Sequence, residues 1–340
     1  MTALTPATAP DPVAPPVTPP DGLRVGGRWT RFALRRAGRL LVSLWVLVTA
    51  SFLMIHLVPG DPVRAALGMT APADLVAAKR AELGLDDPLL TQYLHYLGHL
   101  FTGNLGESIA TELPVAQTIG QRLPATASLA VLAFLVALAI AIPVGVALAV
   151  ATRRGRRRRT ELAFAGTSVV LGSIPDFLLG VALVAVFAVN LGVLPVAGRE
   201  GPDSYLLPVL ALAIGPAAVL ARIVRVEMLA VLETDYIRTA RAKRLPPLRI
   251  TLRHALPNAV TATLTLGGML LSTMIAGTVL VENVFAWPGL GSTIVSSIVA
   301  KDYPMVQGTV LVYGAIVLVV NTLVDLALAT IDPRSTIGDT

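Results

Sequence analysis

The sequence predicts an all-α polytopic membrane protein with six transmembrane helices. The chain has 340 residues, of which 54% are hydrophobic and only 14% are charged, and its mean hydropathy is +0.73. Soluble domains carry about 25% charged residues, so this chain has too few charges to cover a water-facing surface of its size. Six stretches are nearly free of Asp, Glu, Lys and Arg, and a membrane-spanning helix needs ~20 such residues. They are residues 40–58, 123–152, 162–198, 204–221, 255–281 and 303–324.

The N-terminal region divides into a tail and a first span. Residues 1–30 are predicted to form a disordered, Pro-rich cytoplasmic tail, because a segment with seven prolines among its first 23 residues cannot bury a core. The first transmembrane helix is expected at 37–58. The tail lacks the charged-then-apolar order of a signal peptide, so this helix is expected to remain as an uncleaved anchor.

Residues 59–122 are expected to form an extracytoplasmic loop with a net charge of −3. Within it, Asp87-Pro88 is a good helix start, and apolar residues then recur at helical spacing. Such an amphipathic helix can lie on the bilayer or pack against a partner, and the sequence favours neither. Its His95 and His99 are too few ligands to predict a metal site. The apolar stripe consists of Leu90, Tyr93, Leu94, Leu97 and Phe101.

Residues 123–332 are predicted to form the main transmembrane domain, in which the third span contains Pro175 and Asp176. A carboxylate in the bilayer costs ~2.5–3.5 kcal/mol on the insertion scale, so one interpretation is a functional intramembrane acid. The other, which we favour, is a helix break at residues 173–175, with Asp176 capping the next segment in a water-lined region.

The distribution of the 27 Lys and Arg residues sets the orientation. Six precede the first span, six lie between spans two and three, eight lie between spans four and five, and one follows the last span. The opposite side holds only six. The positive-inside rule therefore places both termini in the cytoplasm, which an even number of spans allows. These cations separate apolar spans instead of gathering on one soluble face, which argues against nucleic-acid binding.

Motifs of self-contained catalysis are missing. The sequence has no Cys, no G-x-x-x-x-G-K-[ST], no G-x-S-x-G and no H-E-x-x-H. A secondary carrier would need intramembrane charges or visible repeat halves, and an intramembrane enzyme would need a paired nucleophile and base. Both classes are therefore disfavoured alternatives. Because the spans are almost bare of ionisable groups, we expect another subunit to supply the energy.

The charged segment 227–258 lies between spans four and five, on the predicted cytoplasmic side. Two short helices are expected, at 235–243 and 248–256, separated by Pro246-Pro247. Such a pair could be a rigid lever that a soluble partner grips. On charge alone, a solvated loop with helical turns is the preferred interpretation.

A sequence resemblance favours the interpretation of segment 227–258 as a rigid lever. Segment 227–258 resembles the cytoplasmic signature of permease subunits in binding-protein-dependent ABC importers, which reads E-A-A, three residues, Gly, nine residues, I-x-L-P. Arg238-Thr239-Ala240 occupies the first position and His254-Ala255-Leu256-Pro257 the last. Arg244 stands where the family has Gly, which permits a tight reversal. We expect Pro246-Pro247 to supply the break instead.

The resemblance extends over residues 40–334 and is strongest to the dipeptide, oligopeptide and nickel branch. Each matching motif is short, but their order and spacing agree along the chain. They are HLVPGDP at 56–62, LGLDDP at 83–88, QY at 92–93, GNLGES at 103–108, LPAT at 123–126, DYIRTARAK at 235–243, VENVF at 281–285, PGLG at 288–291, DYP at 302–304, NTLVD at 321–325 and DPR at 332–334.

The resemblance implies a non-catalytic permease subunit with the type I ABC importer permease fold, in the bacterial cytoplasmic (inner) membrane and in contact with lipid. The implied partners are a homologous second permease, two cytoplasmic ABC ATPases and an extracytoplasmic substrate-binding protein. ATP and Mg would be bound by the ATPases and no cofactor by this chain. The implied cargo is a short peptide, while nickel or another small solute stays open.

The resemblance also implies site residues. Those expected to couple to the ATPase are Asp235, Tyr236, Arg238, Thr239, Ala240, Arg241, Lys243, Arg244, Leu245, His254 and Leu256. Pro175 and Asp176 are candidates for the translocation path. Those expected near the binding protein or the outer gate are Tyr93, Leu97, Glu282, Phe285, Pro288 and Gly289.

Overall fold

The computed structural model describes residues 25–57, 62–68, 70–82 and 84–331. Over these residues the chain is helical, with one isolated β-bridge between Glu107 and Pro114 and no strand. Helix α1 (Val25–Leu57) begins before residue 37 and takes up the last residues of the expected tail. The rest of that tail lies outside the described residues, as do motif residues 58–61 and 83 and the closing 332–334.

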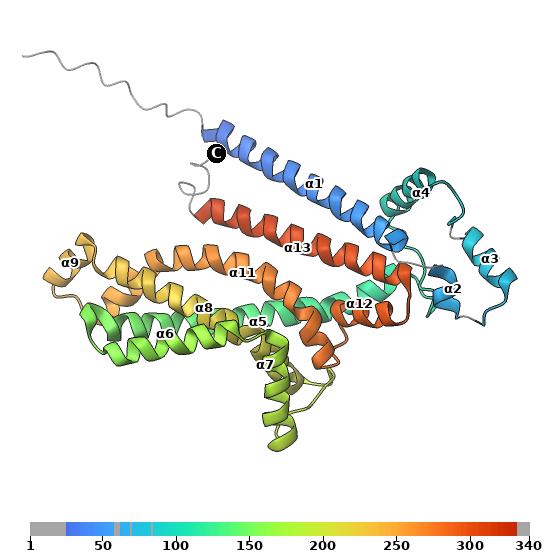
Figure 1. Cartoon of the computed structure of the whole chain (residues 1–340). Coiled ribbons are helices and arrows are strands. Elements are labelled where there is room, and N and C mark those ends of the chain that lie inside the picture. Colours follow the sequence, from blue (N-terminus) through green and yellow to red (C-terminus); the bar gives the residue numbers. More distant parts are fainter. Residues whose placement is uncertain (1–24, 58–61, 69, 83, 332–340) are drawn as a thin grey trace, which may run out of the picture.

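Five long helices run lengthwise beside one another (Figure 1): α1, α5 (Val115–Thr152), α8 (Leu206–Leu232), α11 (Leu256–Val284) and α13 (Tyr303–Ile331). The most extensive contact joins α5 to α8, the next joins α8 to α11, and α1 packs on α13. Each of the five is long and apolar enough to cross a membrane, and a bent helix pair provides a sixth span if counted as one. The predicted all-α, six-span architecture is confirmed in this sense.

The bent pair is the third predicted span. Helix α6 (Arg158–Ser173) ends at a break, after which α7 (Asp176–Leu183) continues into the π-helical Val184–Asn190. The two parts of the pair, Arg158–Ser173 and Asp176–Asn190, are bent relative to each other by 98°. Ile174 is extended, with φ −74° and ψ 125°, because a residue before proline is pushed out of the helical region. The predicted break is therefore present, although Asp176 is the first residue of α7 and makes no side-chain cap hydrogen bond.

Short helices gather at the two ends of the bundle. Helices α2 (Pro62–Leu67), α3 (Ala73–Glu82), α4 (Leu89–Phe101) and α12 (Leu290–Val299) lie at one end, and α9 (Asp235–Ala242) lies at the other (Figure 1). The first end carries the predicted extracytoplasmic loop, so we call it the outer end, and we call the end with α9 the coupling end.

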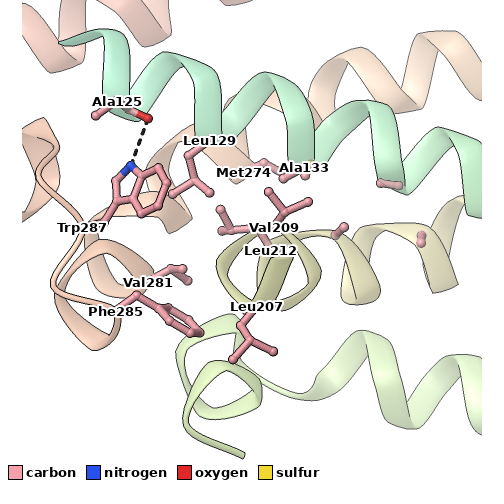
Figure 2. Close-up of a cluster of buried hydrophobic side chains, with 14 of the residues drawn as sticks. Ala125, Leu129, Ala133, Leu207, Val209, Leu212, Met274, Val281, Phe285 and Trp287 are labelled. Atoms are coloured by element: carbon pink, nitrogen blue, oxygen red, sulfur yellow. Dashed lines mark hydrogen bonds between the residues drawn. The ribbon is translucent and has the colours of Figure 1, made fainter. Parts of the chain in front are cut away.

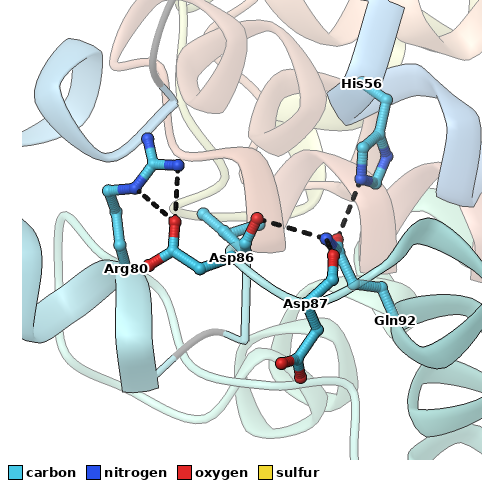
Figure 3. A network of polar contacts seen from close by, with 6 residues as sticks. His56, Arg80, Asp86, Asp87 and Gln92 are labelled. Carbon is cyan, nitrogen blue, oxygen red and sulfur yellow. Dashed lines mark hydrogen bonds and ion pairs between the residues drawn. The ribbon is translucent and has the colours of Figure 1, made fainter.

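Helix α4 rests on the outer end of α1. The Tyr93 and Thr49 hydroxyls lie 2.8 Å apart, and the Tyr93 and Phe52 ring centroids lie 5.1 Å apart. Gln92 links the same helices, because its Oε1 lies 3.0 Å from His56 Nε2 and its Nε2 donates to the Asp87 carbonyl at 2.7 Å (Figure 3). One face of this amphipathic helix thus contacts its own chain. Leu90, Leu94 and Phe101 remain exposed.

The largest core cluster lies where α5, α8 and α11 meet, around Trp287, Phe285 and Leu212 (Figure 2). Small residues allow the helices to approach closely, as is common in membrane bundles. Gly145 of α5 is the clearest case, because a Cβ there would lie 2.6 Å from the Ala221 carbonyl oxygen of α8.

Candidate coupling site and outer helix junction

Helix α9 is amphipathic, with one face in a core and the other in solvent. Ile237 and Ala240 are buried in a cluster with Met228, Ile250 and Ala259. The opposite face is exposed and consists of Asp235, Tyr236, Arg238, Thr239 and Ala242. Burial of one face anchors the helix and leaves the other free for a partner.

Polar contacts fix the ends of α9 to α8. Thr234, the N-cap residue, donates its hydroxyl to the Val231 carbonyl at 2.7 Å, and Arg241 Nη2 donates to the Leu232 carbonyl at 3.1 Å. Desolvation by burial, followed by the positive charge of Arg154, lowers the pKa of the Arg241 guanidinium from its ordinary value. Arg241 therefore has a structural contact. Arg238, by contrast, forms its one ion pair within the described part of the chain with Asp235, at 3.0 Å on the open surface.

The turn after α9 corrects an expectation about Arg244. Arg244 has a φ of +58°, the left-handed conformation that glycine adopts most easily. Its N–H donates to the Arg241 carbonyl at 2.8 Å, and the Leu245 N–H donates to the Ala240 carbonyl at 3.3 Å. These two bonds make a Schellman motif, which closes the helix end. The reversal thus begins at Arg244 itself, before Pro246-Pro247, and Arg244 adopts a backbone conformation that favours glycine.

The second predicted coupling helix is not a separate element. Helix α10 (Pro247–Arg249) runs through a π-helical stretch, Ile250–Ala255, directly into α11. The prediction of an end near Pro257 is wrong, because proline is tolerated at the start of an α-helix and here occupies its first turn. Coupling-segment motion at this end would thus pass directly into a membrane span.

The remaining predicted coupling residues lie near α9. Asn258 Nδ2 donates to the His254 carbonyl at 2.9 Å and to the Tyr236 hydroxyl at 3.2 Å. Leu245 and Leu256 pack against the α9 cluster, and Lys243 is exposed. The structure therefore brings the predicted coupling residues together at one end, and it places Pro175 and Asp176 elsewhere, at the helix break.

Asp176 lies between the long helices. Its carboxylate is so near Gly215 of α8 and Gly277 of α11 that Cβ atoms there would lie 3.6 Å and 3.0 Å from its oxygens. The residue is half-buried, and no side chain in the described part of the chain forms a hydrogen bond or an ion pair with it. Glycines on both neighbours leave room for this acid.

Glu282 is the centre of the outer helix junction, where α5, α11 and α12 meet. Its side chain is fully buried. Its Oε1 accepts a hydrogen bond from the Thr126 hydroxyl at 2.7 Å, and its Oε2 accepts one from the Ser292 N–H at 3.1 Å. Thr126 Oγ1 in turn accepts the Leu290 N–H at 2.8 Å. A carboxylate at the start of α12 satisfies N–H groups that have no partner within the helix.

Trp287 completes the same junction, donating its Nε1 hydrogen to the Ala125 carbonyl at 3.1 Å (Figure 2). The motifs at 123–126, 281–285 and 288–291 therefore lie together in the outer helix junction. Phe285 and Gly289 are buried in it, Pro288 is half-buried, and Tyr93 and Leu97 are half-buried in α4. In this chain, most of the predicted outer residues thus hold the structure together and expose little surface.

Other motifs also join distant segments. Asp302 accepts the Ser108 hydroxyl and, as the N-cap of α13, accepts the Met305 N–H at 3.3 Å. Asn321 accepts the Ser272 hydroxyl, and Asp325 pairs with Arg36 of α1. These motifs are visible in the sequence but their partners are not, since no local pattern connects residues 194 positions apart.

Within the part of the chain that the structure describes, no group of three or more His, Cys, Asp or Glu side chains could hold a metal ion. His95 and His99 lie on the exposed side of α4.

Comparison with known proteins identifies the family. Residues 141–337 match the family model of the binding-protein-dependent transport system inner membrane component, and residues 29–130 match the model of its N-terminal region. The chain belongs to this family. The glutathione transport system permease protein GsiC of Salmonella typhimurium (strain LT2) is 36% identical over 303 residues, which is 89% of this chain and 97% of that protein. The corresponding Escherichia coli (strain K12) protein is 35% identical over the same length.

The solved structures agree on the fold. The permease is similar to a chain of the MetNI methionine ABC transporter in inward-facing conformations, with a TM-score of 0.54, 19% identity, and coverage of 64% of this chain and 97% of that one. The permease thus has the type I ABC importer fold and is a multi-pass inner-membrane protein. It is a non-catalytic subunit, because ATP use in such importers belongs to a partner.

Proposed function

We propose that this permease forms, with a homologous second permease, the translocation path for short peptides or peptide-like molecules. Two cytoplasmic ATPases would bind ATP and Mg, and an extracytoplasmic binding protein would deliver the substrate. The peptide class is supported by the relatives, which are named as permeases of a glutathione transport system, because glutathione is a tripeptide. The excess of Lys and Arg supports termini and α9 on the cytoplasmic side.

The observation that carries the proposal is the exposed face of α9. Ile237 and Ala240 anchor the helix, so that Tyr236, Arg238 and Thr239 can enter a groove of an ATPase. Helix α9 is joined by a short closed turn to a helical run that continues into α11. A push on α9 during ATP-driven closure would therefore reach a membrane span, which is how alternating access would be driven.

A charge-reversal pair tests this coupling. Arg238→Glu changes the exposed face of α9, and Arg159→Glu makes the same change at an exposed position of α6. In the importer reconstituted with its own ATPases, we expect Arg238→Glu to reduce ATPase co-purification and ATP-dependent uptake at least tenfold. Arg159→Glu should change neither by more than about twofold. Normal assembly and uptake in Arg238→Glu would refute the coupling role of α9.

The substrate class is tested separately, by uptake. Cells lacking the permease and cells carrying it would be compared for uptake of radiolabelled glutathione, a dipeptide and nickel. We expect permease-dependent uptake of glutathione or of the dipeptide. Uptake of nickel alone would replace the peptide proposal and leave the importer assignment intact.

Pro175 and Asp176 are proposed to border the translocation path. The 98° break opens the helix, and Asp176 faces two glycines of neighbouring spans. We expect Asp176→Asn to lower uptake while ATPase co-purification stays normal. Uptake equal to that of the unchanged permease would remove Asp176 from the path.

The outer helix junction is proposed to shape the outer gate. Glu282, Phe285 and Gly289 are buried, so they would act by holding α12 in place, with Pro288 at the rim. Tyr93 and Leu97 would position α4, whose exposed Leu90, Leu94 and Phe101 could meet the binding protein or outer leaflet lipid.

A further inference from the structure

A cavity of about 330 Å³ lies at the coupling end, between the end of α5, the end of α8, α9 and residues 247–251. Its walls contain four arginines, together with apolar residues such as Leu245 and Ile250. The arginines are Arg153, Arg154, Arg156 and Arg241. No carboxylate lines it.

The four guanidinium groups are poorly neutralised by the protein. Among the described residues, none of the four forms an ion pair. Arg153 and Arg241 both donate to one acceptor, the Leu232 carbonyl at the end of α8, at 3.3 Å and 3.1 Å. Arg153 Nε is buried and has no partner within the described part. Glu233 is in electrostatic range of Arg153 but does not line the cavity.

The backbone around these arginines is also unusual. Arg154 and Arg157 have φ values of +57° and +54°, in the left-handed region that costs energy for residues with a Cβ. Repulsion between these like charges opposes folding, and so does the backbone strain in the loop that carries them. An anion with several oxygen atoms would offset the repulsion and accept the free N–H groups.

The depth of the cavity indicates the kind of anion. Val150 and Arg153 line it and belong to the last turns of the apolar span Val115–Gly155. Because a cluster of arginines follows directly, we expect this span to leave the membrane here, on the positive side. Phospholipid phosphates lie at this level, and basic pockets between helices on this side suit anionic headgroups. Arginine is well matched to phosphate because its planar fork donates two parallel hydrogen bonds.

We propose that this cavity binds a phosphate-bearing anion, and its depth favours the headgroup of an anionic phospholipid over a free phosphate. A bound phosphate would connect the end of α5 to α9 through Arg153, Arg154 and Arg241. Binding itself does not depend on the proposed function. Its consequence, a dependence of ATP-driven uptake on anionic lipid, rests on the coupling role of α9.

Two matched double variants test the site. Arg154→Gln with Arg156→Gln removes two cavity cations, and Arg158→Gln with Arg159→Gln removes two exposed cations that do not line the cavity. All four positions are exposed, so each variant should fold. Binding of phosphatidylglycerol and phosphatidylcholine to the delipidated full chain would be measured by native mass spectrometry, with inorganic phosphate and pyrophosphate as competitors.

We expect preferential binding of phosphatidylglycerol, weakened about fivefold for each cavity guanidinium removed and almost unchanged in the second variant. If pyrophosphate or phosphate competes with the lipid, the site is assigned to a free phosphate source. If neither competes, the site is assigned to lipid. Equal weakening in both variants, or no preference for phosphatidylglycerol, would overturn the proposal. So would loss of ATPase co-purification in the cavity variant without any change in anion binding, because the cavity would then receive an acidic group of the ATPase.

Discussion

The two ends of the permease differ in how their polar groups are satisfied. At the outer helix junction, Glu282 is fully buried and satisfied by Thr126 and by a backbone N–H. At the coupling end, Arg238 lies on an exposed face and four other arginines surround a cavity without a carboxylate.

The difference shows that the polar groups of the outer helix junction are satisfied within this chain, whereas those of the coupling end are not. Buried donors and acceptors that pair with one another rigidify a joint, and removing one leaves the rest unsatisfied. Exposed helix faces and unneutralised cations are stabilised little by contacts within their own chain. Contacts with a partner protein or an anion can stabilise them more. We therefore expect substitutions at the outer helix junction to affect stability and those at the coupling end to affect assembly.

The largest effect is expected for Glu282→Ala. It leaves the Thr126 hydroxyl and the Ser292 N–H without their acceptor, and two buried unpaired donors cost about 3 kcal/mol together. Chemical unfolding in detergent would measure the loss. The exposed neighbour Asn283→Ala is the control and should cost less than about 1 kcal/mol. Similar losses in both variants would contradict the special role of Glu282.

Gly291→Ala tests how tightly the same junction is packed. A Cβ there would lie 2.5 Å from Val279 Cα and 2.9 Å from Glu282 Oε2, so we expect a loss of about 1–3 kcal/mol from overpacking. Gly120→Ala in α5 meets nothing within 4 Å and should be stabilising by about 0.5–1 kcal/mol. The same unfolding assay compares them, and an effect of the same sign in both would contradict the packing argument.

Arg244→Gly is expected to stabilise the coupling end by about 1 kcal/mol, because glycine adopts φ +58° without a Cβ penalty. Arg244→Ala removes the charge but keeps the Cβ, so it should give no gain. Hydrogen exchange of the α9 amides would measure the difference. Equal protection in the two variants would show that charge, and not backbone conformation, is the relevant property.

The smallest effect is expected for Asp235→Asn, which removes the exposed ion pair with Arg238. Side chains exposed to 92% and 72% contribute less than about 0.5 kcal/mol through such a pair. Unfolding at low and high salt would check this. A larger, salt-dependent loss would mean that the coupling end is held together by its surface charges.

The sequence predicted the spans and the helix break because both depend on local composition. Uncharged stretches mark the membrane helices, and Pro175 excludes the residue before it from a helix. The helix at α9 and a helix start near Asp87-Pro88 could also be predicted, since both depend on local sequence signals. The N-cap of α4 is nevertheless Pro88 and not Asp87, and no side chain caps the helix.

The sequence did not reveal what depends on distant contacts. Glu282 was predicted to lie near the binding protein or the outer gate, whereas its burial depends on a hydrogen-bond partner, Thr126, that is 156 positions away. The left-handed Arg244 was missed because arginine rarely adopts that conformation. The arginines at 153–156 were counted for topology, and no spacing rule could show that Arg241 meets them around one cavity.

Cross-linking tests the central claim most directly, because the chain has no native cysteine and each introduced one is unique. Thr239→Cys lies on the exposed face of α9, and Ser296→Cys lies on the exposed side of α12. With a maleimide photo-cross-linker in the assembled importer, the account predicts a covalent adduct with the ATPase from Thr239→Cys and none from Ser296→Cys. An ATPase adduct from Ser296→Cys, or its absence from Thr239→Cys in an active complex, would contradict it.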